Sequence, residues 1–178
     1  MAINFIIPFT PDKQLAAHYN EQANRFDDDD WICFVDADAM FLDPYFGQHL
    51  EKIVENHGDE FLAFTCMTNR VGNLKQCHQR KMSSNFDLMH HLKIAEARKK
   101  EYFGTVLDFR PSPPMSGVMI LSKVSTIKKI PFRGAGMLGV DNNFHQDISA
   151  KGKFGLILGV YLFHKYRAGN IKNKTHMK

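Results

Sequence analysis

Apolar runs of strand length alternate along the chain with longer segments in which apolar residues recur at helical spacing. A continuous apolar run such as Trp31–Val35 is typical of an inner strand that is covered on both faces. Strands are predicted at residues 3–8, 31–35, 61–66 and 117–121, and one or two more at 154–162. Helices are predicted at residues 13–25, 46–56, 85–102, 123–129 and 141–151. Strands that alternate with helices indicate an α/β layer fold.

Length and composition fit a single domain. The chain of 178 residues is 44% hydrophobic, which is ordinary for a globular domain, and we expect one domain over residues 1–167 and a basic, flexible tail over 168–178. No apolar run approaches the roughly 20 residues that span a bilayer, and the N-terminal segment lacks the basic residues of a signal peptide. Cys33, Cys66 and Cys77 have no CxxC spacing, which favours a reducing compartment. We therefore expect a cytoplasmic protein without a transmembrane segment.

The net charge of +4 suits a protein that handles phosphorylated ligands. Basic residues gather in the segment 75–110 and after Lys151. Aromatic residues are not interleaved with them as they are in RNA-binding modules, so we do not expect a nucleic-acid partner. The acidic run Asp27–Asp30 lacks the glycine and the final glutamate of an EF-hand loop, and we interpret it as a solvated turn.

The basic central segment contains three histidines, His78, His90 and His91. Their spacing does not make a metal site, and we expect them at the surface. Helical periodicity within residues 85–102 predicts an inner face that includes Phe86, Met89 and Ala97.

Two carboxylates two residues apart follow the predicted inner strand. Asp36 and Asp38 point the same way in strand geometry, and such close like charges repel each other unless a hard divalent cation lies between them. Open α/β sheets bind ligands outside the carboxyl ends of their strands, so a metal there can bridge a diphosphate. Mn²⁺ or Mg²⁺ fits oxygen ligands of this kind. The alternative is a pair of loop acids without a metal.

With this motif the sequence resembles the GT-A glycosyltransferases, in particular small family-2-like members of bacteria and their phages. Five segments carry the resemblance in the family's order: residues 6–9, 31–42, 116–120, 139–144 and 161–167. The resemblance implies a GT-A-like fold with a mixed, mainly parallel sheet flanked by helices. The chain between the first predicted strand and Asp36 has room for one helix but not for the family's additional strand, so the N-terminal nucleotide-binding half is abbreviated.

The resemblance implies a metal-dependent glycosyltransferase of the hexosyltransferase type. It would move a sugar from a nucleotide-diphosphate donor to a hydroxyl of a saccharide, lipid-linked or protein acceptor. Asp141 would be the general base, with inversion at the sugar, and His164 would complete the metal site. As alternatives, Asp141 is a helix N-cap, a position that aspartate favours, and His164 is a packed or surface residue beside a strand.

The same resemblance assigns the remaining contacts with the donor. Pro8, Phe9 and Thr10 would contact the nucleotide at the end of the first strand. Lys165 and Arg167 would neutralise the departing diphosphate, as cationic side chains do. Ordinary surface charge is the alternative for the two cations.

Two further residues are candidates for contact with the donor or the acceptor. Arg70 follows the predicted strand 61–66 on the expected ligand edge, where it can hold a phosphate or a sugar; otherwise it is a surface arginine in a loop. Gly117 is small enough to let a sugar approach the backbone, or it serves strand packing alone.

Two other functions remain open from the sequence. A phosphatase similar to the HAD family would use Asp36 as its nucleophile, although that family places its DxD motif on the first strand. A non-catalytic nucleotide- or sugar-binding module with the GT-A fold would keep the metal site without turnover, and the short nucleotide half is consistent with it.

Overall fold

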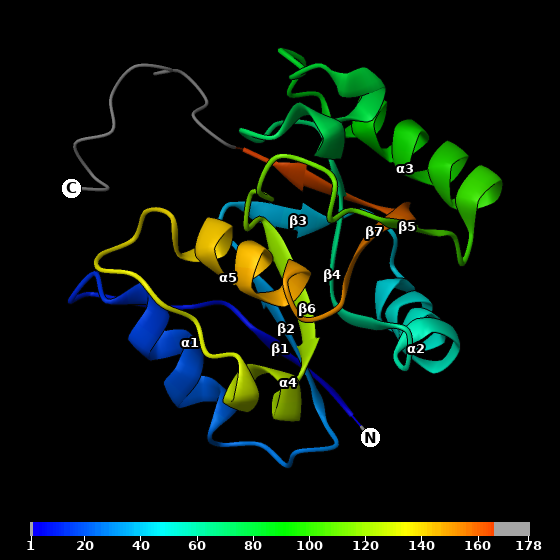
Figure 1. The fold of residues 1–178 in the computed structure, drawn as a ribbon. Coiled ribbons are helices and arrows are strands. Elements are labelled where there is room, and N and C mark those ends of the chain that lie inside the picture. Colours follow the sequence, from blue (N-terminus) through cyan, green and yellow to red (C-terminus); the bar gives the residue numbers. More distant parts are fainter. Residues whose placement is uncertain (1, 166–178) are drawn as a thin grey trace.

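The structure, a computed structural model, describes residues 2–165 and has an α/β fold (Figure 1). Within these residues the sheet has seven strands, in the order β1-β2-β6-β4-β7-β3, with β5 paired to β7. The strands are β1 (Ile3–Ile6), β2 (Trp31–Val35), β3 (Ala39–Phe41), β4 (Phe61–Thr68), β5 (Val106–Asp108), β6 (Met119–Lys123) and β7 (Lys153–His164). The helices are α1 (Leu15–Ala23), α2 (Phe46–His57), α3 (Leu88–Tyr102), α4 (Val124–Lys129) and α5 (Val140–Ser149), with short 3₁₀ helices η1 (Leu74–Gln76) and η2 (His78–Arg80). The predicted α/β class is confirmed.

The sheet is mixed, as predicted, but the prediction that it is mainly parallel is wrong. β1 pairs in parallel with β2, and β4 pairs in parallel with β7. β6 lies between these two pairs and is antiparallel to both neighbours, while β3 and β5 are antiparallel to β7. The irregular chain over residues 109–118 brings β6 in at the edge where β2 and β4 end, so β6 has to run in the opposite direction.

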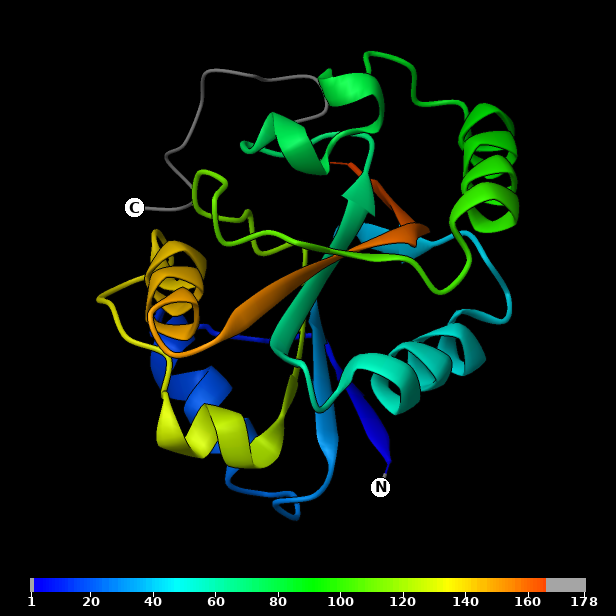
Figure 2. The same cartoon turned by 45° about the vertical axis from the view of Figure 1, so that its right-hand side comes forward.

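Helices cover both faces of the sheet. α1, α4 and α5 lie together on one side (Figure 1), and α2 lies on the other (Figure 2). Alternate residues of β2 point to opposite faces, as strand geometry requires. Ile32 and Phe34 enter the core beneath α1, α4 and α5, whereas Cys33 and Val35 enter the core beneath α2. All of β2 is buried, which confirms the prediction of an inner strand.

The face that α3 buries differs from the predicted one. Its inner face carries His91, Ala95 and Arg98, while Phe86 and Met89 are exposed. The helix begins at Leu88, after Asp87, whose side chain accepts a hydrogen bond from the backbone N–H of the second helical residue. Two of the three inner side chains are polar or charged, so the hydrophobic pattern misplaced the face.

Several other expectations hold. The three cysteines are buried and free of disulfides. Only α1 separates β1 from β2, in agreement with the prediction of one helix and no additional strand there. None of the helices in residues 2–165 is long and apolar enough to cross a membrane. The predicted tail, residues 168–178, lies outside the described part of the chain.

Candidate metal centre

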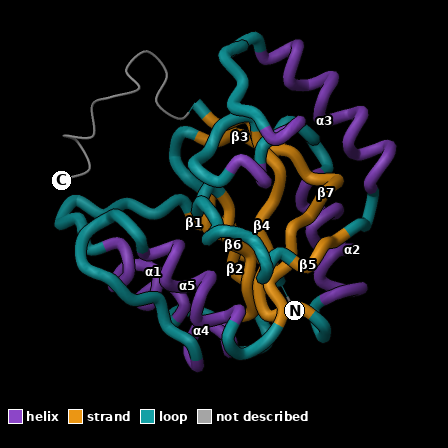
Figure 3. The backbone as a smooth tube through the Cα atoms, turned by 45° about the horizontal axis from the view of Figure 1, so that its top comes forward, coloured by secondary structure: helices purple, strands orange, loops and turns teal. Residues whose placement is uncertain are grey.

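Most of the predicted site residues meet at one edge of the sheet. β1, β2, β4 and β7 run in the same direction, because β6 is antiparallel to both β2 and β4. Their carboxyl ends therefore share an edge, and β6 begins there. Figure 3 turns this edge toward the viewer. Asp36 follows β2, Arg70 follows β4, His164 ends β7, and Gly117 precedes β6.

Asp36, Asp38 and His164 form a compact group, as predicted. The Nε2 atom of His164 lies 3.0 Å from Oδ1 of Asp38 and 3.6 Å from Oδ2 of Asp36. One ligand atom from each residue lies within 4.8 Å of the other two. His164 is buried, with 4% of its surface exposed, whereas the two carboxylates are partly open to solvent. The group therefore has a fixed inner ligand and two accessible outer ligands.

The short strand β3 places Asp38 beside His164. The chain turns after β2, where the N–H of Ala39 donates to the carbonyl of Asp36 at 3.0 Å. β3 then pairs with the end of β7, with Ala39 opposite His164. The N–H of Lys165 donates to the carbonyl of Asp38 at 2.9 Å. Backbone pairing therefore sets the approach of Asp38 to His164.

The imidazole of His164 is oriented by the loop that follows β4. Its Nδ1 lies 2.8 Å from the carbonyl oxygen of Arg70. A carbonyl can only accept, so Nδ1 carries the proton and Nε2 faces the carboxylates. Metal-ligating histidines in proteins usually donate their other ring N–H in this way.

Charge and burial act against each other in this group. Burial raises the pKa of Asp36 to about 6, with the charge of His164 opposing that rise. Burial also acts to lower the pKa of His164, but the hydrogen bond and charge of Asp38 outweigh it and raise that pKa. The charges of Asp36 and Asp38 therefore favour a proton on His164.

The donor set fits a divalent metal. Two carboxylates and one imidazole, whose Nδ1–H is held by a carbonyl and whose Nε2 faces the carboxylates, are common ligands for such ions. One ligand atom of each residue lies within 4.8 Å of the others, close to the roughly 4 Å that separates opposite ligands of an ion that binds oxygen and nitrogen at about 2.0–2.2 Å. Of the two ions expected from the sequence, Mn²⁺ suits the imidazole better, because Mg²⁺ prefers oxygen ligands and retains water.

Asp141 lies beside the metal group but is not a helix N-cap. It is the second residue of α5, and the cap is Gly139, whose φ of 79° is left-handed. Oδ2 of Asp141 accepts a hydrogen bond of 2.7 Å from the N–H of Gly117. Burial raises the pKa of Asp141, against the hydrogen bonds from the backbone of Gly117 and Asn142. The charge of Asp141 in turn raises the pKa of Asp36, so the two carboxylates act on one another.

The structure gives a reason for glycine at position 117. A Cβ atom there would lie 2.8 Å from Cβ of Asp141 and 3.3 Å from its Oδ2, closer than unbonded carbon atoms approach. The missing side chain lets Asp141 reach the backbone N–H. The predicted approach of a sugar to Gly117 stays a prediction.

The other predicted contacts lie at the same edge or beyond the described residues. Pro8, Phe9 and Thr10 lie just beyond β1, after Ile7, and Phe9 is 80% exposed, so its ring is open to a ligand. Lys165 is exposed next to His164. Arg167 lies outside the described residues.

Arg70 is buried, so the alternative interpretation as a surface arginine in a loop is wrong. Only 7% of its surface is exposed. Its guanidinium donates to the carbonyl of Ser83 and lies 5.5 Å from the ring centre of Phe86. Its backbone carbonyl also holds His164, so Arg70 contributes to the site through the protein's own contacts.

Asn69 belongs to this site, although the sequence did not single it out. Its Oδ1 accepts from the N–H of His164 at 2.7 Å, and its Nδ2 donates to the carbonyl of His164 at 3.1 Å. Both bonds are buried, and they fix the backbone of the histidine. The one available signal was its place in the polar run 68–70, shortly after the predicted strand 61–66, where the charge of Arg70 drew attention instead.

Replacing Asn69 with alanine is expected to weaken Mn²⁺ binding by about 10- to 100-fold, the usual effect of losing a group that orients a ligand. It should also lower the free energy of unfolding by about 1–3 kcal/mol, because two buried backbone groups of His164 lose their partners. Calorimetric Mn²⁺ titration and urea unfolding measure the two effects. The control is Asn56→Ala, an exposed position on α2. Unchanged Mn²⁺ affinity in Asn69→Ala would show that the hydrogen bonds between Asn69 and His164 do not affect metal binding.

No protein-family model matches this chain, and a search of curated proteins found none that is significantly similar to it.

Proposed function

We propose that the chain is a metal-dependent glycosyltransferase with a GT-A-like fold. It would transfer a sugar from a nucleotide-diphosphate donor to an acceptor hydroxyl. The observation that carries the proposal is that a candidate metal-binding group and a separate carboxylate lie side by side at one edge of the sheet. Asp36 and Asp38 with His164 make a group suited to a divalent cation, and Asp141 stands next to it on a different element, held by Gly117.

The metal-binding group and Asp141 have separate roles in this reaction. The cation, when bound, supplies positive charge to the diphosphate that leaves the sugar. Asp141 takes the proton from the acceptor hydroxyl as that oxygen attacks the anomeric carbon. Its raised pKa makes it a stronger base than an ordinary aspartate. One displacement of this kind inverts the configuration at the sugar.

The N-terminal elements suit the nucleotide. Pro8, Phe9 and Thr10 follow β1, which is parallel to β2 and adjacent to it, so they lie next to the strand end that carries Asp36. Phe9 offers an exposed aromatic face, on which a base can stack. The exposed Lys165 is close enough in the chain to His164 to meet the diphosphate.

Titration with a panel of nucleoside diphosphates tests the proposal. Binding of one nucleotide is expected with Mn²⁺ and not with EDTA, and Asp38→Ala should abolish it. The matched control is Asp27→Ala, an exposed acid in the loop before β2. If no nucleotide binds under any condition, the proposal fails. A covalent aspartyl phosphate at Asp36 after incubation with a phosphate ester would instead support the phosphatase. Binding of nucleotide without transfer from any nucleotide sugar would support a non-catalytic module.

A further inference from the structure

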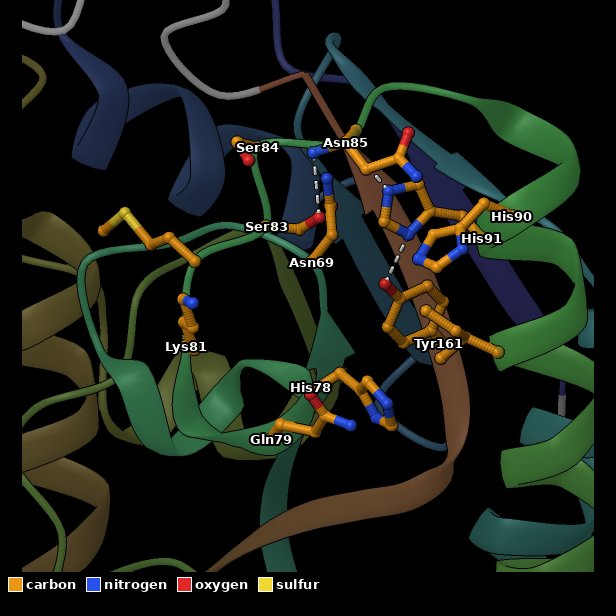
Figure 4. Close-up of a pocket in the computed structure, with 12 residues that line it drawn as sticks. Asn69, His78, Gln79, Lys81, Ser83, Ser84, Asn85, His90, His91 and Tyr161 are labelled. Atoms are coloured by element: carbon orange, nitrogen blue, oxygen red, sulfur yellow. Dashed lines mark hydrogen bonds between the residues drawn. The ribbon is translucent and has the colours of Figure 1, made fainter.

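A polar pocket lies between α3, β7 and the segment that contains η2 (Figure 4). Its volume is about 220 Å³, less than the roughly 300 Å³ at which pockets for drug-sized ligands begin. It shares Asn69 with the metal centre, but Asp36, Asp38 and His164 are not among its lining residues. The pocket is therefore a separate feature of the molecule, with room for a small group.

The lining of the pocket is basic and rich in hydrogen-bond donors. Lys81 and three histidines line it, together with the hydroxyls of Ser83 and Ser84. None of the lining residues is an aspartate or a glutamate. Burial lowers the pKa of His78, and the positive charge of Arg98 adds to that effect. The lining thus offers the positive charge of Lys81 and several hydrogen-bond donors, with no carboxylate among its residues.

On one side of the pocket, the ring nitrogens of His91 already have hydrogen-bond partners. His91 is fully buried, which corrects the expectation that it lies at the surface. Its Nε2 donates to the carbonyl of Asn85 at 2.8 Å, and its Nδ1 lies 2.8 Å from the hydroxyl of Tyr161. Burial raises the pKa of Tyr161, so the hydroxyl keeps its proton and can donate it to Nδ1. Figure 4 shows these contacts on one side of the pocket.

His78, whose ring lies beside that of Tyr161, holds a polar atom without a partner. Nδ1 of His78 is buried, and it has no hydrogen bond within the described chain. A buried nitrogen without a partner is unfavourable, and His78 is one of the residues that line the pocket. The next two residues, Gln79 and Arg80, both have left-handed backbones, with φ of 56° and 55°. This conformation is costly for residues other than glycine, so tertiary contacts hold the segment in place.

A metal ion does not explain the pocket. His78, His90 and His91 do not bring ligand atoms within 4.8 Å of one another, since the group with that property in residues 2–165 is Asp36, Asp38 and His164. Both ring nitrogens of His91 are also occupied. The chemistry that remains is that of donors and positive charge around a small volume.

We propose that this pocket binds a compact anionic group, a phosphate monoester or a carboxylate, through His78, His90, Lys81 and the hydroxyls of Ser83 and Ser84. The inference does not depend on the glycosyltransferase proposal, because none of the metal ligands takes part. A charge-assisted hydrogen bond from the ammonium group of Lys81, together with N–H and O–H donors of the imidazoles and hydroxyls, is the kind of contact that holds such anions in proteins.

The test uses inorganic phosphate, phosphoserine and acetate as probes, with chloride as the reference anion. Proton NMR follows the ring signals of the histidines, which are assigned with His78→Gln and His90→Gln. Phosphate or acetate should shift the signals of His78 and His90 in a saturable way in the millimolar range or below. The signal of His57, which is hydrogen-bonded to the carbonyl of Gly104 and does not line the pocket, should not move. Comparing the affinities for phosphate and acetate shows whether the pocket prefers a phosphate or a carboxylate group.

Variants separate this proposal from the metal centre. Lys81→Gln with His90→Gln changes two exposed side chains and should weaken anion binding about tenfold or more. Lys93→Gln, an exposed lysine of α3 that does not line the pocket, should leave it unchanged. Asp38→Ala should also leave it unchanged, even though it abolishes binding at the metal centre. The proposal is overturned if wild type shows no saturable shift, or if Lys81→Gln with His90→Gln binds as wild type does.

Discussion

Replacing Asp38 with asparagine is expected to weaken Mn²⁺ binding by about 100-fold or more, because the substitution keeps the shape of the side chain and removes the charge that a cation needs. Half of the Asp38 side chain is exposed, so the fold should tolerate the change. Electron paramagnetic resonance of free Mn²⁺, with the protein titrated in, measures the affinity directly. The result addresses the metal alone and needs no nucleotide.

The control is Asp27→Asn, which removes the same charge from an exposed loop position and should bind Mn²⁺ as wild type does. Thermal unfolding of both variants without metal checks that neither has lost the fold. His164→Gln provides the second arm, since it removes the nitrogen ligand from the buried side of the group. If Asp38→Asn and His164→Gln both retain wild-type affinity, Asp36, Asp38 and His164 are not a metal centre.

The sequence predicted the elements of the fold better than their directions. β2 was recognisable because all five of its residues are apolar and buried, and the α/β alternation followed from similar runs. The direction of β6 was not encoded in its own residues. It depends on the irregular segment 109–118, where three prolines interrupt the periodicity and nothing local states at which edge the chain arrives.

The candidate site was predictable where its signal lay in one short segment or in the order of segments. Asp36 and Asp38 carry their own motif, and His164 matched a position late in the resembled family. β3, which brings Asp38 to His164, has three residues and no distinctive pattern. The role of Asn69 depends on a contact across 95 positions of the chain. Contacts of this range follow from the sheet order and not from local residue types.

Tertiary contacts also explain why His91 and Asp141 differ from what was expected of them. His91 was expected at the surface because it lies in the basic central segment without metal-site spacing, but Tyr161 and the carbonyl of Asn85 satisfy both of its ring nitrogens, so burial costs little. Asp141 was open to an N-cap role because aspartate favours it, yet Gly139 caps the helix. This leaves the Asp141 carboxylate to bind the N–H of Gly117 and to face the metal group.

Replacing Asp141 with asparagine is expected to lower the turnover of sugar transfer by about 10²- to 10⁴-fold, the range for losing a general base. The amide oxygen can still accept the hydrogen bond from Gly117, so nucleotide and Mn²⁺ affinities should stay at wild-type values. Transfer is measured as release of nucleoside diphosphate from the donor identified by titration, with the acceptor at saturation. Asp147→Asn is the control, because it removes an acid of the same helix that pairs with Arg133 and is not near Gly117.

Gly117→Ala distinguishes a base from a structural acid. The added methyl group would meet Cβ of Asp141 at 2.8 Å, so it displaces the carboxylate without altering its chemistry. Turnover should fall in this variant too, while the affinity for Mn²⁺ at Asp36, Asp38 and His164 stays within a few fold. If Asp141→Asn retains full turnover, the acceptor proton leaves by another route and Asp141 serves only to position β6. If both variants lose Mn²⁺ affinity as well, Asp141 supports the metal group instead of acting on the acceptor.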